Sequence, residues 1–248
     1  MFVNQYILGV NPFFDAYLQS DLLGKLIFIG LIALSILTWM ILIYKVILTQ
    51  RARKNSLIFA SSFSNYKGNL LNVDISVPKG EEGVNPFFNL YQVLKKQTVE
   101  LLNKNRRFGA KDEETGASFL SLSDVAVVES HLMTTIASEI KFLDKYVYAL
   151  ATIVSLGPFL GLLGTVWGIL TTFSDMQAQT GGNTSQMVLG GLSLALTTTV
   201  LGLLDAIPAL IGYNYLKNDI RNFETDMQAF SNGILASVEM QYRKVELN

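Results

Sequence analysis

Three long runs without a charged residue constrain this chain of 248 residues more than any other feature. The runs cover 26–44, 146–174 and 176–204, and the apolar pattern of the third continues past Asp205 to residue 216. A helix needs about 20 apolar residues to cross a hydrocarbon layer about 30 Å thick. Each run is long enough to span a membrane, and longer than most buried helices of soluble proteins. We therefore predict an all-α integral membrane protein with transmembrane helices at 22–44, 148–172 and 187–212.

The basic residues predict how these spans are oriented. Fourteen of the nineteen Lys and Arg residues lie in 45–145, and none lies in 1–24 or 172–187. Basic residues that flank membrane spans stay on the cytoplasmic side. We expect an outer N-terminal segment at 1–21, a cytoplasmic region at 45–147, an outer turn at 173–186 and a cytoplasmic C-terminal helix at 213–248.

The cytoplasmic region is helical by pattern. A stripe of apolar residues with helical spacing runs through 90–102, and Ser121 followed by Asp124 is typical of a helix start. Glycine and proline predict a loop at 67–86, and a charge-rich turn is expected at 105–117. No helix breaker follows Asp124 until Gly157 and Pro158. We therefore expect spans two and three to extend as helices into a cytoplasmic helical bundle.

Small residues recur at spacings of four, three and four in both later spans. Span two has Gly157, Gly161, Gly164 and Gly168, and span three has Gly191, Ala195, Thr198 and Gly202. Such spacing places each set on one helix face, within about 60°. Small residues let helix backbones approach closely in lipid. The pattern predicts helix packing within one subunit, and we favour packing between subunits of an oligomer as well.

Polar residues at membrane depth are candidates for an ion pathway. Thr165 lies on span two, and Thr197, Thr198 and Thr199 form a cluster on span three. A threonine hydroxyl can bond to its own helix, so threonine alone indicates a pore only weakly. Asp205 is a stronger candidate because an acid inside a span costs several kcal/mol, roughly 3 on insertion scales. The alternative is that Asp205 lies near the wetted cytoplasmic end or pairs with a basic residue.

The composition excludes several other functions. The chain has no cysteine and a single histidine, His131, which excludes thiol catalysis, iron–sulfur clusters and a histidine-rich metal site. The net charge of −1 predicts no nucleic-acid partner. Gly181-Gly182 lacks the Lys and Ser/Thr of a phosphate-binding loop. We expect neither an enzyme nor a bound cofactor.

Two segments resemble a known family. Residues 149–173, ALATIVSLGPFLGLLGTVWGILTTF, and residues 191–214, GLSLALTTTVLGLLDAIPALIGYN, are similar to the second and third spans of the TolQ/ExbB/MotA family of proton-channel motor proteins. The span-one region, with Gly24-Lys25, Ser35, Trp39 and Lys45, resembles the TolQ branch more than the others. The resemblance is weak in 55–120 and 174–186.

The resemblance implies a multi-pass protein of the bacterial inner membrane, with the N-terminus in the periplasm and the C-terminus in the cytoplasm. Family members form pentamers around a dimer of a single-span partner of the TolR or ExbD type, which carries a membrane aspartate. Proton flow through that interface drives a periplasm-spanning protein of the TolA or TonB type, for outer-membrane integrity and constriction at division. The two pore threonines of the family correspond to Thr165 and Thr199.

The chain departs from the family pattern at one position. Leu194 stands where the family has a glutamate, five residues before the span-three threonine, and Asp205 stands where other members have a small apolar residue. We hypothesise that Asp205 takes over an acidic role roughly 16 Å further along the same helix face. Two alternatives stay open, an ExbB-like energiser of TonB-dependent uptake and a membrane scaffold that has lost conduction. The ion, H⁺ or Na⁺, also stays open.

Overall fold

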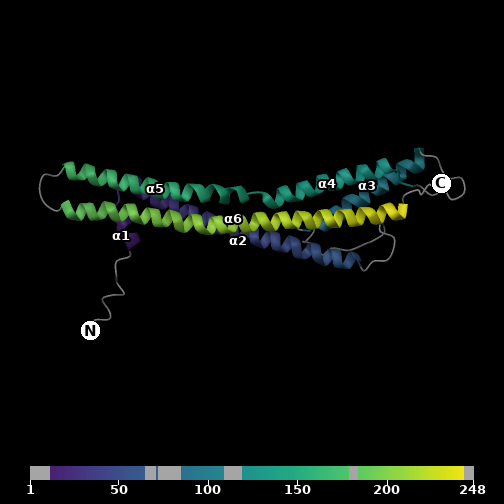
Figure 1. Cartoon of the computed structure of the whole chain (residues 1–248), viewed down its shortest axis with the longest axis horizontal. Coiled ribbons are helices and arrows are strands. Elements are labelled where there is room, and N and C mark those ends of the chain that lie inside the picture. Colours follow the sequence, from purple (N-terminus) through teal and green to yellow (C-terminus); the bar gives the residue numbers. More distant parts are fainter. Residues whose placement is uncertain (1–11, 65–70, 72–84, 109–118, 179–183, 243–248) are drawn as a thin grey trace, which may run out of the picture. The chain divides into compact units, whose positions relative to one another are not determined.

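The computed structural model describes residues 12–64, 71, 85–108, 119–178 and 184–242. Its helices, in chain order in Figure 1, are α1 (Pro12–Gln19), α2 (Leu22–Ser64), α3 (Pro86–Phe108), α4 (Leu122–Asp144), α5 (Val147–Ala178) and α6 (Thr184–Tyr242). The expected loop at 67–86, most of the turn at 105–117 and the middle of the outer turn at 173–186 lie outside the described residues.

The chain forms two compact units. The first comprises residues 1–44 and 146–216, and the second comprises 45–145 and 217–248. Helices α2 and α6 each contribute residues to both units, because each continues without interruption well beyond the length of a membrane span.

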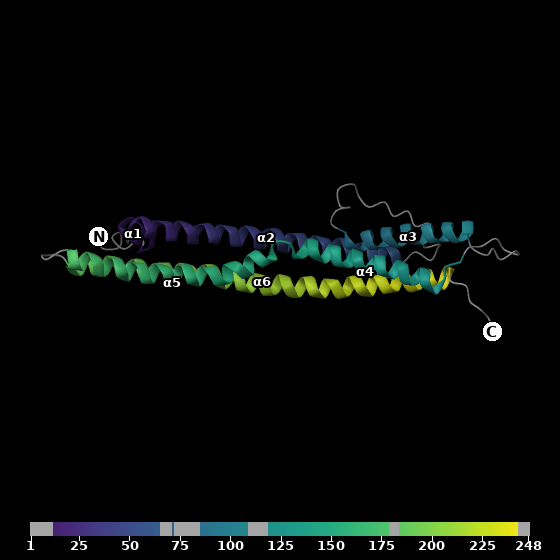
Figure 2. The same ribbon diagram turned by 90° about the horizontal axis from the view of Figure 1, so that it is seen from above.

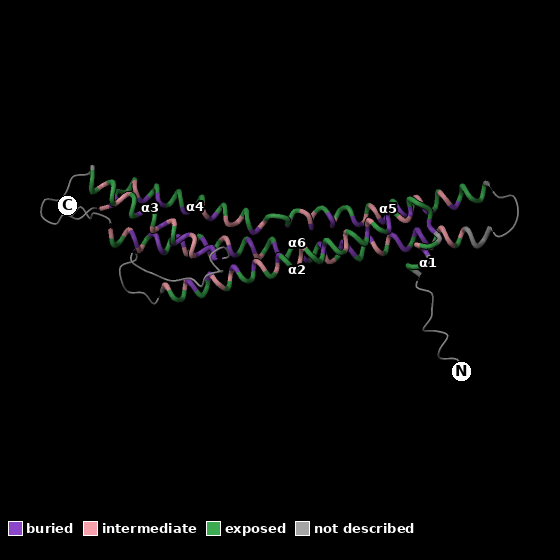
Figure 3. The backbone as a smooth tube through the Cα atoms, turned by 180° about the vertical axis from the view of Figure 1, so that it is seen from behind, coloured by how far each residue is buried: buried purple, intermediate pink, exposed green. Residues whose placement is uncertain are grey.

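The first unit contains the three apolar spans. Three of the described helical stretches are long and apolar enough to cross a membrane, and each overlaps one of the three runs identified in the sequence. Many large apolar side chains of these stretches are exposed, as the tube in Figure 3 shows along α5. So much exposed apolar surface does not suit water, whereas it suits lipid and neighbouring subunits. The prediction of an all-α membrane protein with three spans is confirmed.

Helices α5 and α6 lie side by side in both views of the ribbon (Figures 1 and 2). They run antiparallel, because Gly157 of α5 contacts Gly202 of α6, whereas Gly168, further along α5, contacts the earlier residue Gly191. Both helices continue through an internal proline, Pro158 in α5 and Pro208 in α6. A proline inside a helix leaves the carbonyl group four residues earlier without its usual hydrogen bond.

The second unit begins its helices with well-formed caps. Asn85 caps α3, since its side-chain oxygen accepts from the amide of Phe88 at 3.2 Å, and Pro86 occupies the first helical position, where proline is favoured. Ser121 and Asp124 form a capping box at the start of α4. The helix start predicted there is confirmed. The apolar stripe predicted on α3 is also confirmed, with Leu90 and Leu94 fully buried.

Charge and aromatic contacts hold the second unit together. The Arg53 guanidinium donates to Asp219 at 2.9 Å and to Asp226 at 3.1 Å, which joins α2 to α6 through two carboxylates. The rings of Phe87 and Phe230 stack with centroids 4.4 Å apart, so α3 packs against α6. These contacts require both long helices to continue past their membrane spans.

One expectation about the helices is wrong. The sequence predicts an unbroken helix from Asp124 into span two, but α4 ends at Asp144 and α5 begins at Val147. Tyr146 between them has a φ of 71°, a left-handed conformation that is strained for a residue other than glycine. Part of the physical reason is Lys45, a buried residue whose amine donates to the last carbonyl groups of α4, Phe142 at 3.4 Å and Leu143 at 3.0 Å. A cation that binds these carbonyl groups stabilises a helix end at this point.

Candidate functional site

The small residues of α5 and α6 form one seam of close backbone contact, which we call the glycine seam. It consists of Gly157, Gly161, Gly164 and Gly168 on α5 with Gly191, Ala195, Thr198 and Gly202 on α6. A Cβ atom placed on Gly157 would lie 2.8 Å from the Gly202 carbonyl oxygen, and one on Gly168 would lie 2.8 Å from the Gly191 carbonyl oxygen. Real Cβ atoms do not approach so closely, so any side chain at these positions would force the helices apart.

The Gly161 carbonyl group is the polar centre of this seam. It accepts hydrogen bonds from the hydroxyl groups of Thr198 and Thr199, each at 3.4 Å, across the helix pair. Both hydroxyls also bond within α6, to the carbonyl of Ala195 at 3.0 and 3.3 Å. Because Gly161 has no side chain, the backbone of α6 can come near enough for these bonds to form.

Thr165 lies one helical turn after Gly161 on α5, so it is on the same side of that helix. Its hydroxyl donates to the Leu162 carbonyl oxygen at 2.6 Å, and its side chain is half-buried. Thr199 is also half-buried. The two residues that the resemblance assigns to a pore therefore both keep part of their surface exposed near the Gly161 carbonyl.

A neighbouring face of α6 contains Leu194 and Asp205, and both side chains are buried. Leu194 packs in an apolar cluster with Ala16 of α1 and Phe28 of α2. The position at which the resemblance implies a glutamate thus packs against apolar side chains in this chain.

Asp205 is only 6% exposed, and it faces α2. The Ser35 side chain of α2 lies close to its carboxyl group, and the carboxyl oxygen Oδ2 is buried without a hydrogen-bond partner among the described atoms. Ser35 is the middle residue of the uncharged run 26–44. Asp205 therefore lies against the centre of span one, and no described basic residue pairs with it.

Sequence reasoning missed a polar contact between α2 and α5. The Trp167 indole donates to Asp21 Oδ2 at 2.9 Å, and Asp21 Oδ1 accepts from the Gly24 amide at 2.8 Å at the start of α2. One carboxylate thus caps α2 and holds span two. The two residues are 146 positions apart in the sequence. The only signal available was an acid directly before an apolar run, which indicates a cap but not its second partner.

In the second unit, the pKa of Asp124 is shifted because this residue belongs to the cap of α4. Burial acts to raise the pKa of Asp124, but hydrogen bonds from Ser121 and Asn105 and the nearby charge of Lys104 outweigh it, so this pKa lies below its ordinary value. The bond from the Ser121 backbone amide is 2.9 Å long, and those from the Ser121 hydroxyl and the Asn105 amide are both 2.8 Å long. The carboxylate is therefore held ionised as part of the α4 cap.

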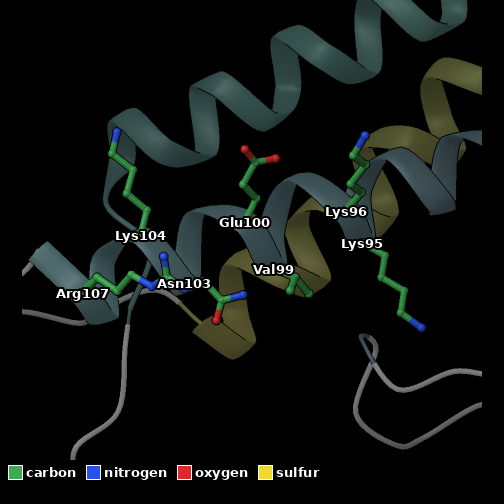
Figure 4. A pocket seen from close by; sticks show the side chains of 7 residues that line it. All are labelled: Lys95, Lys96, Val99, Glu100, Asn103, Lys104 and Arg107. Atoms are coloured by element: carbon green, nitrogen blue, oxygen red, sulfur yellow. The ribbon is translucent and has the colours of Figure 1, made fainter.

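A basic hollow of about 670 Å³ lies on the outer face of α3. Its lining residues are Lys95, Lys96, Val99, Glu100, Asn103, Lys104 and Arg107. Figure 4 shows Lys95 and Lys96 pointing to opposite sides, so the charges do not converge on one point. Among the described residues there is also no cluster of three His, Asp or Glu side chains that could hold a metal ion. The polar groups in the first unit remain the better candidates for a site.

Comparisons of the sequence with known proteins give matches over most of the chain. A model of the MotA/TolQ/ExbB proton channel family matches residues 103–229. The Tol-Pal system protein TolQ of Haemophilus influenzae is 29% identical over 223 residues, which cover 88% of this chain and 90% of that protein. The biopolymer transport protein ExbB of Neisseria meningitidis is 27% identical over 208 residues, 84% of this chain and 88% of that protein.

Similarity is higher over a shorter stretch in a third relative. The biopolymer transport protein ExbB of Aquifex aeolicus is 45% identical over 89 residues, 36% of this chain and 60% of that protein. The family match spans the whole glycine seam together with Thr165, Thr199 and Asp205. The chain is a member of the MotA/TolQ/ExbB proton channel family.

Proposed function

We propose that this chain is the pore-forming subunit of a motor complex of the bacterial inner membrane, driven by the proton-motive force. With a single-span partner of the TolR or ExbD type, it couples proton flow to force on a periplasm-spanning protein of the TolA or TonB type. In a TolQ-like role the output is outer-membrane integrity and constriction at division. The similarity to both TolQ and ExbB supports this class of complex.

One observation carries the proposal: Thr165 and Thr199 lie half-buried on adjacent helices, and the Thr199 hydroxyl bonds to the carbonyl of Gly161, one helical turn before Thr165. Two helices cannot enclose a pathway, so the wall is completed by further copies of the chain, in a pentamer around the partner dimer. Hydroxyl groups both donate and accept hydrogen bonds, which suits a proton pathway that has no charged wall. Thr198 is fully buried in the glycine seam, and in this proposal it supports the pathway by holding α5 against α6.

The test is proton flux into vesicles that contain the chain co-expressed with its single-span partner. Thr165→Val and Thr199→Val keep the side-chain shape and remove the hydroxyl, so we expect flux to fall to the level of partner-free vesicles. Thr152→Val is the matched control, because Thr152 is exposed on α5 and its hydroxyl bonds only to its own helix at Tyr148, at 3.1 Å. Equal flux in all three variants would refute the proposed pathway.

The orientation that goes with this function places the N-terminus in the periplasm and the second unit in the cytoplasm. The concentration of basic residues in 45–145 supports it. Because the chain has no cysteine, single-cysteine variants give a clean test. A membrane-impermeant thiol reagent added to spheroplasts should label Leu18→Cys, which is exposed near the N-terminus, and should leave Ser121→Cys unlabelled.

A non-conducting scaffold is the second candidate, and Leu194 favours it. An apolar residue that packs against Ala16 and Phe28 stands at the position where the resemblance implies a glutamate. A scaffold would assemble with its partners, and vesicles containing the wild-type complex would show no proton flux. The same measurement therefore separates the two candidates.

A further inference from the structure

From the position of Asp205 we infer a second protonatable site in this subunit, formed by the Asp205 carboxyl group and the Ser35 hydroxyl in the seam between α2 and α6. This inference deepens the proposed function, since it gives span one a part in proton handling.

The first argument is burial at membrane depth. Asp205 is 94% buried, and its partner Ser35 has nine uncharged residues on each side in the run 26–44. At 1.5 Å per residue, Ser35 is about 13 Å from either end of that run. The carboxyl group is therefore held in the hydrocarbon region, where an acid marks a functional site unless it is paired.

The second argument is an oxygen without a partner. Oδ2 of the carboxyl group is buried and has no hydrogen-bond partner among the described atoms, although the Ser35 side chain lies close by. Buried polar groups are nearly always bonded, so an orphan oxygen calls for an explanation. A proton that binds there converts the carboxylate into a carboxylic acid, and no other bond is made or broken.

The third argument is the absence of a counter-charge in the surrounding helices. Helix α5 has no charged residue from Val147 to Ser174, and α6 has none from Asp205 until Lys217, about 18 Å further along. On α2 the nearest charges are Lys25 and Lys45, each ten residues from Ser35 and so about 15 Å along the helix. Of the tyrosines on these helices, Tyr44, Tyr148 and Tyr215 have exposed side chains, and Tyr213 of α6 is half-buried, eight residues after Asp205. A proton is therefore the simplest cation that can neutralise this carboxylate.

The site lies at a different place on α6 from the Thr199 hydroxyl. Thr199 bonds toward α5 at Gly161, whereas Asp205 faces α2 at Ser35. Asp205 follows Thr199 by six residues, about 9 Å along α6 toward its cytoplasmic half. Asp205 is also not part of the apolar cluster that contains Leu194.

The test uses infrared difference spectroscopy on the wild-type complex with its single-span partner. A protonated carboxylic acid has a C=O stretching band that an ionised carboxylate lacks, and the band shifts when the proton exchanges with D₂O. We expect a pH-dependent, exchangeable band that Asp205→Asn abolishes. Asp175→Asn is the matched control, because Asp175 is an exposed acid at the end of α5, and this variant should retain the band.

Two further variants keep the test decisive if Asp205→Asn does not assemble. Ser35→Ala removes the neighbouring hydroxyl and keeps the carboxyl group, so the band should persist at a shifted frequency. Asp205→Glu should retain an exchangeable band at a shifted position. A spectrum that is the same for wild type and Asp205→Asn refutes the site, and so does a band that never changes with pH or D₂O, since that would indicate a structural acid.

Flux measurements separate this inference from the proposed function. If Thr199→Val abolishes proton flux and Asp205→Asn leaves it unchanged, the pathway stands and the role of Asp205 in it is refuted. If the wild-type complex conducts no protons, the function is refuted, and the infrared band still decides whether Asp205 binds a proton.

Discussion

Replacing Gly164 by alanine tests the glycine seam most directly. A Cβ atom at this position would lie 2.6 Å from the Thr198 Cβ and 2.9 Å from its Cγ2, and would overlap its hydroxyl oxygen. Ordinary van der Waals contact begins at 3.4 Å, so the first contact is about 0.8 Å too short. The Thr198 Cβ is fixed to its backbone, and a rotamer change cannot remove it. The helices must therefore separate locally.

The cost follows from this separation. Overpacking of a tight interface costs about 1–3 kcal/mol, and a gap of 0.5–1 Å removes roughly a quarter to a half of each dispersion contact. Alanine also gains about 1 kcal/mol over glycine from helix propensity, which obscures the effect of a single variant. Gly30→Ala on α2 is the matched control, because a Cβ there meets nothing within 4 Å. The propensity gain is similar in both variants, so their difference isolates the contact.

The assay is unfolding of the purified protein by SDS in mild detergent, followed by circular dichroism at one protein concentration. We expect Gly164→Ala to be less stable than Gly30→Ala by about 1–3 kcal/mol, which is roughly a 5- to 150-fold change in the unfolding equilibrium. The proton flux of Gly164→Ala should fall as well, because the separation moves Thr199 away from the Gly161 carbonyl. If the two variants unfold at the same SDS concentration, the packing of α5 on α6 described above is wrong.

Three further predictions concern the second unit. Lys45→Met removes the amine that binds the end of α4, and it should lower the free energy of unfolding of this unit by about 1–3 kcal/mol. Lys54 is exposed, so Lys54→Met should leave the stability unchanged in the same thermal unfolding measurement. Asp124→Asn should lower stability by about 1 kcal/mol at neutral pH. Because the pKa of Asp124 is lowered in the fold, its contribution is complete above the ordinary carboxyl pKa and is lost as the pH falls through the folded value, so wild type and variant should converge in acid. Arg53→Lys should destabilise the unit more than the loss of a surface ion pair would. The reason is that a single ammonium group cannot span two aspartates as the guanidinium does. A variant as stable as wild type would show that one of these ion pairs suffices.

The membrane spans and the small-residue contacts follow from local patterns. An uncharged run of sufficient length leaves few alternatives to a span, and a 4-3-4 spacing of small residues places them on one helix face whatever the tertiary structure. The α4 cap was also visible in the sequence, because Ser121 and Asp124 bond to each other over three residues. These features need no information from distant parts of the chain.

The features that could not be predicted depend on distant residues. The end of α4 depends on Lys45, whose bonds to Phe142 and Leu143 cross almost 100 positions of sequence. The environment of Asp205 depends on which face of α2 meets α6, and nothing in the α6 sequence specifies Ser35 as the partner. Neither the mean hydropathy of +0.35 nor the helical periodicity of the sequence contains information about these two contacts.

The polar residues Thr198, Thr199 and Asp205 of α6 lie at membrane depth and face two different helices. The face toward α5 is satisfied by backbone contacts, since glycines let the hydroxyl groups of Thr198 and Thr199 reach the Gly161 carbonyl. The face toward α2 contains Leu194 and Asp205, and Ser35 of α2 lies close to the Asp205 carboxyl group. A chain that needed polar residues only for packing would have no use for an acid on the second face, because an apolar residue there would avoid the cost of burying a carboxyl group. Retention of an acid with a free oxygen at this depth is best explained if α2 and α6 hold a proton between them.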